Sequence, residues 1–181
     1  MKRPGVRVLA GRWKGRELAA GSNTRPTSSR ARAALFDILQ NRIGGAAVLD
    51  LFAGSGAVGI EAVSRGARRA VLVEPEAAAL VSAVERLGAA PTELRVLAEG
   101  ARSGVRRLAR DGERFDFVFA DPPYGDSLDP ELLAALPDLL NPDGVFVLQR
   151  DDEAADTRVP GLRLAQKRPY GRNVFLFFGM R

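Results

Sequence analysis

The sequence predicts one α/β domain built on a mostly parallel sheet of seven strands, and three observations predict it. The length of 181 residues suits a single domain. From about residue 43 onward, short apolar runs bounded by Gly or Pro alternate with helical stretches, which is typical of parallel strands joined by crossover helices. The last two apolar runs are separated by only four residues, too few for a crossover helix, so they must pair as an antiparallel hairpin.

The N-terminal part predicts a small hairpin followed by a helix. Residues 6–18 have the pattern of two short strands that turn near Gly11 or Gly15. A loop with Gly, Ser, Thr and Pro follows, and Ser28 or Ser29 can cap the helix after it. That helix runs to about residue 41, because its apolar positions recur at the helical period until a Gly-Gly pair.

The remaining elements follow from apolar runs and their spacing. The five predicted parallel strands are Ala47–Phe52, Ala70–Glu74, Leu94–Leu97, Phe115–Ala120 and Val145–Gln149. The predicted helices between and after them are Ala57–Arg65, Glu76–Leu87, Ala101–Arg110 and Pro130–Leu139. The closing antiparallel pair is Leu162–Arg168 with Asn173–Phe178.

The composition excludes several kinds of site. The chain has no Cys and no His, which removes disulfides, cysteine nucleophiles, Cys/His zinc sites and catalytic triads with histidine. We therefore expect chemistry that uses carboxylates, backbone groups or a bound cofactor, and no metal. No run of about 18 apolar residues is present, and the first residues lack the apolar stretch of a secretory signal. We expect a cytoplasmic protein.

Charge divides the chain into a basic N-terminal extension and a slightly acidic main domain. Residues 1–42 hold ten Lys and Arg against two Asp and Glu, a net charge of +8. Residues 43–181 hold 17 against 20, a net charge of −3. A basic segment on an acidic body indicates a polyanionic partner, most commonly nucleic acid, although a solvated basic face would give the same count.

A glycine loop follows the first predicted strand. Gly54, Gly56 and Gly59 match the pattern G-x-G-x-x-G between a strand and a helix. Glycines let the backbone approach a ligand, and the helix N-terminus offers unpaired N–H groups. We expect a side chain placed on Gly56 to occupy the cofactor's space and leave the fold intact. Glu74 ends the next strand, where its carboxylate can bind both ribose hydroxyls of an adenosine. These features fit both a dehydrogenase that binds a dinucleotide and an enzyme that binds an adenosine-containing sulfonium cofactor.

The segment Asp121-Pro-Pro-Tyr124 separates these alternatives. It lies at the carboxyl end of the fourth parallel strand, the edge at which such sheets bind ligands. Proline has no N–H, so the segment presents carbonyls and a carboxylate, which are acceptors for an amino group. Tyr124 can stack on a base. Such a site can orient a planar amine so that its lone pair faces an electrophilic methyl group.

Together these motifs resemble a known family. Asp50-Leu-Phe-Ala-Gly-Ser-Gly56 with Asp121-Pro-Pro-Tyr124 is similar to the signature of class I S-adenosylmethionine-dependent amino-methyltransferases, which have a Rossmann-like fold. The N-terminal part resembles the small bacterial 16S rRNA guanine-N2 methyltransferases of the RsmD type in these segments: Gly11-Arg-Trp-Lys-Gly-Arg-Glu-Leu18, Arg25-Pro-Thr27, Arg30, Arg32, Ala34-Leu-Phe36 and Leu39. The resemblance implies methyl transfer from S-adenosylmethionine to the N2 amine of one guanine in small-subunit rRNA. It covers nearly the whole chain.

The motifs and the resemblance assign three groups of residues. The catalytic group is Asp121, Pro122 and Tyr124. The cofactor group is Asp50, Phe52, Ala53, Gly54, Gly56, Glu74, Glu99 and Asp121. The RNA-binding group is Arg12, Lys14, Arg16, Arg25, Thr27, Arg30, Arg168 and Arg172. Arg168 and Arg172 belong to the tip of the closing hairpin, which we expect at the ligand edge. We expect Trp13 to pack the N-terminal hairpin onto the body rather than to stack on a base.

The resemblance leaves some points open. The family often has an acidic or amide residue near the adenine after the third strand; here Glu99 either makes that contact or the contact is missing. The same pocket could serve DNA adenine-N6 or protein glutamine, although 181 residues leave no room for a separate DNA-recognition domain. An rRNA-binding assembly factor without catalysis is a further alternative. We expect a monomer whose substrate is a partly assembled ribosomal subunit.

Overall fold

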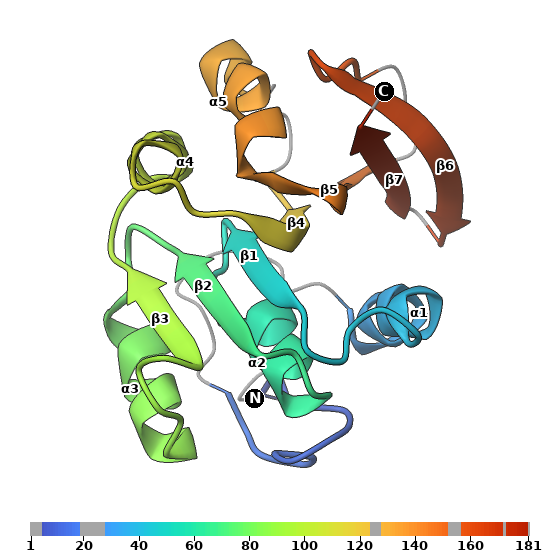
Figure 1. The fold of residues 1–181 in the computed structure, drawn as a ribbon. Coiled ribbons are helices and arrows are strands. Elements are labelled where there is room, and N and C mark those ends of the chain that lie inside the picture. The colour runs from blue at the N-terminus through green and yellow to red at the C-terminus, as the bar shows by residue number, and fades with distance from the viewer. Residues whose placement is uncertain (1–4, 19–27, 124–127, 152–156, 172, 181) are drawn as a thin grey trace.

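The sheet of this computed structural model has seven strands in the order β3-β2-β1-β4-β5-β7-β6 (Figure 1). The structure describes residues 5–18, 28–123, 128–151, 157–171 and 173–180. The strands are β1 Ala47–Leu51, β2 Arg69–Val73, β3 Leu94–Leu97, β4 Phe115–Ala120, β5 Leu140–Asp151, β6 Leu162–Tyr170 and β7 Asn173–Met180. The helices are α1 Ser29–Leu39, α2 Ala57–Ser64, α3 Ala78–Leu87, α4 Ala101–Arg110 and α5 Pro130–Ala135.

The pairing confirms the predicted fold class. Strands β1 to β5 pair in parallel, and β7 runs antiparallel to both β5 and β6. The central parallel strands β1, β2 and β4 are almost fully buried because helices cover both faces. Strand β6 is an edge strand, and most of its residues are exposed.

Most element bounds agree with the sequence to within two residues, and two differ for identifiable reasons. The predicted helix over Pro130–Leu139 ends at Ala135 and continues as a short 3₁₀ turn from Pro137, because proline removes a backbone donor and cannot extend an α-helix. Strand β5 begins at Leu140, five residues earlier than predicted, through a pairing with Phe115 that precedes a register shift.

Two apolar clusters pack on opposite faces of the sheet. Helices α1, α2 and α3 pack on one face, here called the α1 side, and α4 and α5 pack on the other (Figure 1). The α1-side cluster includes the N-terminal residues Val8, Trp13 and Leu18. Residues of the basic extension therefore share a core with the main domain. Among the described residues, none of the helices is both long and apolar enough to cross a membrane.

The predicted N-terminal hairpin is present in minimal form. Its two arms share one isolated antiparallel bridge, Arg7 with Glu17. Both Gly11 and Gly15 have positive φ, 80° and 82°, so both predicted turn positions are used. A Cβ on Gly11 would lie 1.7 Å from the Ser64 carbonyl oxygen, so only glycine permits this approach to the end of α2. Trp13 is 4% exposed, which confirms that it packs onto the body.

Candidate active site

The glycine loop joins the carboxyl end of β1 to α2, next to the end of β4. Leu51 at the end of β1 pairs with Ala120 at the end of β4. The backbone then turns through positive φ at Phe52, Gly54 and Gly56, with values of 60°, 54° and 73°. Among the described residues, Phe52 is the only non-glycine residue with positive φ. Residues that carry a side chain rarely adopt this backbone conformation, and those that do cluster at functional sites.

Glu74, immediately after β2, hydrogen-bonds to the backbone of this loop. Its Oε2 accepts a hydrogen bond from the Gly54 N–H at 2.8 Å, and its Oε1 accepts one from the Glu76 N–H at 3.2 Å. The sequence did not predict the hydrogen bond between Glu74 and the glycine loop. A carboxylate has about four acceptor positions, so the same group can also bind ribose hydroxyls, and that role stays a prediction.

Asp50 is a buried carboxylate beneath the loop. It is 2% exposed, and its Oδ2 accepts a hydrogen bond from the Gly59 N–H at 2.8 Å. Burial raises the pKa of Asp50 to about 7; the bond from Gly59 opposes the rise, and the nearby charges of Asp121 and Glu74 add to it. Carboxylates from three strand ends therefore share one electrostatic environment, which favours a ligand that carries positive charge.

The proline segment follows β4 directly. Asp121 and Pro122 are partly exposed, and Pro123 is exposed, so the segment borders solvent at the ligand edge of the sheet. Asp121 lies close enough to Asp50 to raise its pKa. Tyr124, predicted to stack on the base, lies outside the described residues.

One expectation about the loop is wrong. A Cβ on Gly56 would lie 2.5 Å from Leu80 Cδ1 and 2.9 Å from both Ile60 Cδ1 and Leu72 Cδ2. These atoms belong to the apolar core, so a side chain there would disturb the fold rather than fill the space of a cofactor. Any contact of Gly56 with a cofactor must come from its backbone.

Glu99 lies in the turn between β3 and α4, at the same sheet edge as Glu74. The Glu74 N–H donates to the Leu97 carbonyl at 3.1 Å, and so does the Glu99 N–H at 2.9 Å. The carboxylate of Glu99 pairs with Arg107 Nη1 at 3.1 Å. Its predicted contact with adenine remains a prediction.

The predicted RNA-binding residues differ in what surrounds them. Arg12 forms a two-bond ion pair with Glu93, at 2.7 and 3.1 Å, and stacks 4.3 Å above the Trp13 ring. Lys14, Arg16, Arg30 and Arg168 are exposed. Arg25, Thr27 and Arg172 lie outside the described residues. Arg12 is exposed as well, but its guanidinium is paired with Glu93.

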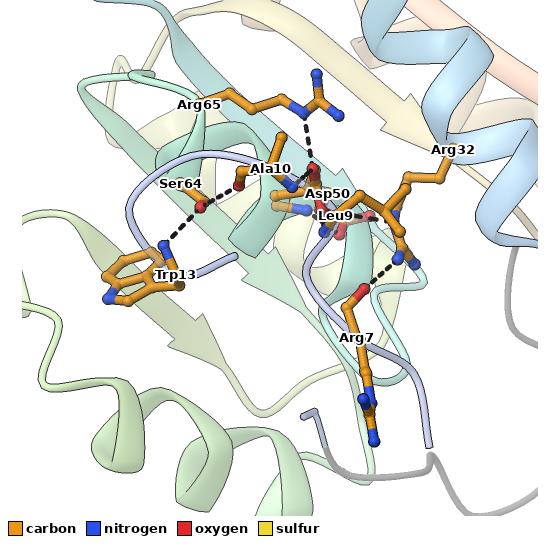
Figure 2. Close-up of polar contacts among 10 residues, drawn as sticks. Arg7, Leu9, Ala10, Trp13, Arg32, Asp50, Ser64 and Arg65 are labelled. Carbon is orange, nitrogen blue, oxygen red and sulfur yellow. Dashed lines mark hydrogen bonds and ion pairs between the residues drawn. The ribbon is translucent and has the colours of Figure 1, made fainter. Parts of the chain in front are cut away.

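A buried carboxylate, Glu61, attaches the N-terminal segment to α2. Glu61 is 0% exposed and accepts from the backbone N–H groups of Leu9 at 2.7 Å and Ala10 at 3.0 Å. It also accepts from Arg65 Nε at 2.7 Å and lies 3.8 Å from the Nε of the fully buried Arg32. Arg32 in turn donates to the Arg7 carbonyl (Figure 2).

Sequence reasoning missed this attachment, although one signal was available. Glu61 is the only charged residue in α2, whose other residues apart from Ser64 are apolar, and a charge on a buried helix requires partners. Ser64, one turn further along α2, adds two contacts: its Oγ accepts from the Trp13 N–H at 3.0 Å and donates to the Ala10 carbonyl at 2.6 Å (Figure 2). The helix that begins at the glycine loop is therefore also the docking element of the basic segment.

Comparison with known proteins places this arrangement in a family. The family described as Conserved hypothetical protein 95 matches residues 6–179. The chain belongs to this family. YlbH of Bacillus subtilis, provisionally named an rRNA methyltransferase, is 32% identical over 173 residues, which are 92% of this chain and 94% of that protein. Ribosomal RNA small subunit methyltransferase D of Escherichia coli is 38% identical over 136 residues, which are 74% of this chain and 67% of that protein.

A solved structure agrees with this family assignment. The structure of yhhF from Escherichia coli, provisionally named a methyltransferase, superposes with a TM-score of 0.84 at 32% identity. The superposition covers 98% of this chain and 99% of that one. The superposition therefore extends over both the N-terminal hairpin and the closing antiparallel strands.

Proposed function

We propose that this chain transfers a methyl group from S-adenosylmethionine to the exocyclic N2 amine of a guanine in small-subunit rRNA. Membership of the family, with relatives named as rRNA methyltransferases, supports rRNA methylation. The observation that carries the proposal is the meeting of the glycine loop, Asp50 and Asp121 at one edge of the sheet.

The residues at this edge suit a cationic donor. When bound, S-adenosylmethionine supplies a methyl group on a positively charged sulfur. The backbone around Gly54 and Gly56 would hold its amino-acid part, and Glu74 would hold its ribose while bracing the loop. Phe52 and Ala53 belong to the same turn, and Glu99 is placed for the adenine at the next strand end.

Asp121, Pro122 and Tyr124 would hold the target amine. The amine of guanine is a weak nucleophile because its lone pair is delocalised into the ring. Two fixed acceptors, the carboxylate and a proline-segment carbonyl, direct its N–H bonds and so aim the lone pair at the methyl carbon. The C–N bond would form as the C–S bond of the donor breaks, and the amine proton would then pass to solvent. Asp121 therefore acts by orientation and needs no raised basicity.

The exposed basic residues of the extension would contact rRNA phosphates. Lys14, Arg16 and Arg30 project from the hairpin and α1, and Arg168 lies on β6. Together with Arg12, Arg25, Thr27 and Arg172 they form the proposed RNA-binding group. In this proposal, residues 1–42 form the RNA-binding extension and residues 43–181 form the methyltransferase domain. A cytoplasmic monomer acting on a partly assembled subunit is part of the same proposal.

Two alternatives differ in measurable ways. A methyltransferase for DNA adenine or protein glutamine would label those substrates instead of rRNA. An rRNA-binding assembly factor would bind RNA without transferring a methyl group. The names of the relatives favour rRNA methylation over both.

The test is incubation with labelled S-adenosylmethionine and small subunits that lack the modification, followed by mass spectrometry of the labelled nucleotide. We expect one N2-methylated guanine. Asp121→Ala should lower single-turnover transfer on the order of a hundredfold or more and retain most cofactor affinity in calorimetry. Label on another base or on protein, or a wild-type rate in Asp121→Ala, would contradict the proposal.

A further inference from the structure

Gln149 is a buried amide at the ligand edge for which the fold offers no internal role. It lies near the end of β5, is 3% exposed, and its Oε1 has no hydrogen-bond partner among the residues that the structure describes. A buried carbonyl oxygen without a partner is destabilising, and such groups are rare in native proteins. Its neighbours along the edge, Asp121 and Arg150, are partly exposed. The amide therefore lies close to solvent at this edge of the sheet.

The register of the sheet places Gln149 beside Asp121. Ala120 of β4 pairs with Leu148 of β5, so the next residues on each strand are Asp121 and Gln149. Neighbouring strands lie about 4.8 Å apart, a distance that one planar base can span. The two residues thus present adjacent polar groups at the ends of adjacent strands.

Both residues also face the α1 side of the sheet. Gln149 pairs with Phe175, and Phe175 belongs to the α1-side cluster, as does Val147 two residues before Gln149. Phe119, two residues before Asp121, also belongs to the α1-side cluster, and side chains two apart on a strand point to the same face. Asp121 is also near enough to Asp50 to raise the pKa of that carboxyl. A base held by Asp121 would therefore have its ring edge next to the Gln149 amide.

We propose that Gln149 binds the target guanine and selects it, an assignment that rests on the proposed function. In guanine, the ring N1–H lies directly beside the N2 amine, and the O6 acceptor follows. With the amine held by Asp121, the Gln149 Oε1 accepts from N1–H, and its amide N–H can donate to O6. The unpaired oxygen of the free protein gains its partner only when the base is bound. Adenine has an acceptor where guanine has N1–H, so it does not match this oxygen.

The test replaces the target guanine by 2-aminopurine in whichever rRNA substrate proves active. This base keeps the 2-amino group but lacks both N1–H and O6. We expect the wild type to methylate it on the order of tenfold more slowly than guanine in single-turnover measurements. Gln149→Leu should be slow with both bases, so that the ratio of the two rates falls toward one, as in a double-mutant cycle. Gln149→Glu keeps the acceptor and should keep the preference for guanine.

Controls separate this assignment from a structural effect and from the proposed function. Thr92→Leu places a leucine at an exposed position in the turn before β3, outside the proposed RNA-binding extension, and should keep the wild-type ratio. Cofactor affinity should be the same in wild type and Gln149→Leu. Wild-type transfer to guanine with an unchanged ratio in Gln149→Leu would overturn the assignment alone. Absence of transfer to guanine by the wild type would overturn the proposed function and this assignment with it.

Discussion

Asp50 accepts a hydrogen bond from the backbone N–H of Gly59 across the glycine loop, with 2.8 Å between Oδ2 and N. Asp50 belongs to β1, and Gly59 lies in the first turn of α2. The bond therefore fixes the strand relative to the helix while the loop between them turns through positive φ. Burial of Asp50 makes this arrangement sensitive to pH.

The first prediction concerns stability against pH. The folded pKa of Asp50 is raised to about 7, so folding favours its protonated form. Its stabilising contribution is full below its unfolded pKa of 3.8 and is lost as the pH rises to about 7. Relative to Asp50→Asn, which does not titrate, the free energy of unfolding of the wild type should fall by up to about 4 kcal/mol across this window. Urea unfolding of both proteins between pH 4 and 8 measures the difference. A constant difference, or one that grows in favour of the wild type, would show that Asp50 is not shifted.

The second prediction concerns Gly56. Gly56→Ala adds a Cβ within 2.5 Å of Leu80 at a φ of 73°, so both packing and backbone conformation are unfavourable. We expect a loss of about 2–4 kcal/mol in the free energy of unfolding. Gly88→Ala is the matched control, because Gly88 has a similar φ of 65° and nothing within 4 Å of its Cβ position. That variant should lose about 1 kcal/mol, which isolates the backbone effect. Equal losses in the free energy of unfolding, measured with urea, would mean that the Leu80 side chain moves aside without a measurable cost.

The third prediction concerns the attachment of the basic segment. Glu61→Ala removes the acceptor of Leu9 and Ala10 and leaves the buried Arg32 without its counter-charge. Loss of one member of a buried ion pair typically costs about 3–5 kcal/mol, and we expect this range. Glu93→Ala is the control, because it breaks the more exposed pair with Arg12 and should cost less than about 1 kcal/mol. A Glu61→Ala protein as stable as Glu93→Ala would exclude this anchoring role.

The fourth prediction concerns RNA binding. Replacing exposed Lys14 and Arg16 by Gln should weaken rRNA binding, and each lost phosphate contact should lower the slope of log K against log salt by somewhat under one unit. Arg12 is omitted because it is paired with Glu93. The control replaces Arg102 and Arg106, two exposed arginines of α4 on the opposite face, each paired with Glu131. Filter binding over a salt series measures both, and cofactor affinity should stay constant. A wild-type slope for the Lys14/Arg16 variant would leave those residues as a solvated basic face.

The sequence by itself determined the order and kind of nearly all elements. Apolar period and turn residues are local properties, so β3, β4 and α4 were predicted with the bounds that the structure has. The antiparallel pairing of β6 and β7 followed from a connection too short for a crossover. The glycine loop and the proline segment could be placed at one edge because parallel strands end on the same side of a sheet.

Only the tertiary structure decided which side chains meet. Arg12 meets Glu93 across 81 positions of the chain, and Glu61 meets Leu9 across 52. The direction of a Gly56 side chain and the position of Gln149 beside Asp121 depend on which strands are neighbours and on the register between them. Periodicity along a chain carries no information about register across a sheet, because register is set by the packing of helices and strands far apart in sequence. The sequence therefore located the candidate site, and the packing determined which groups lie together there.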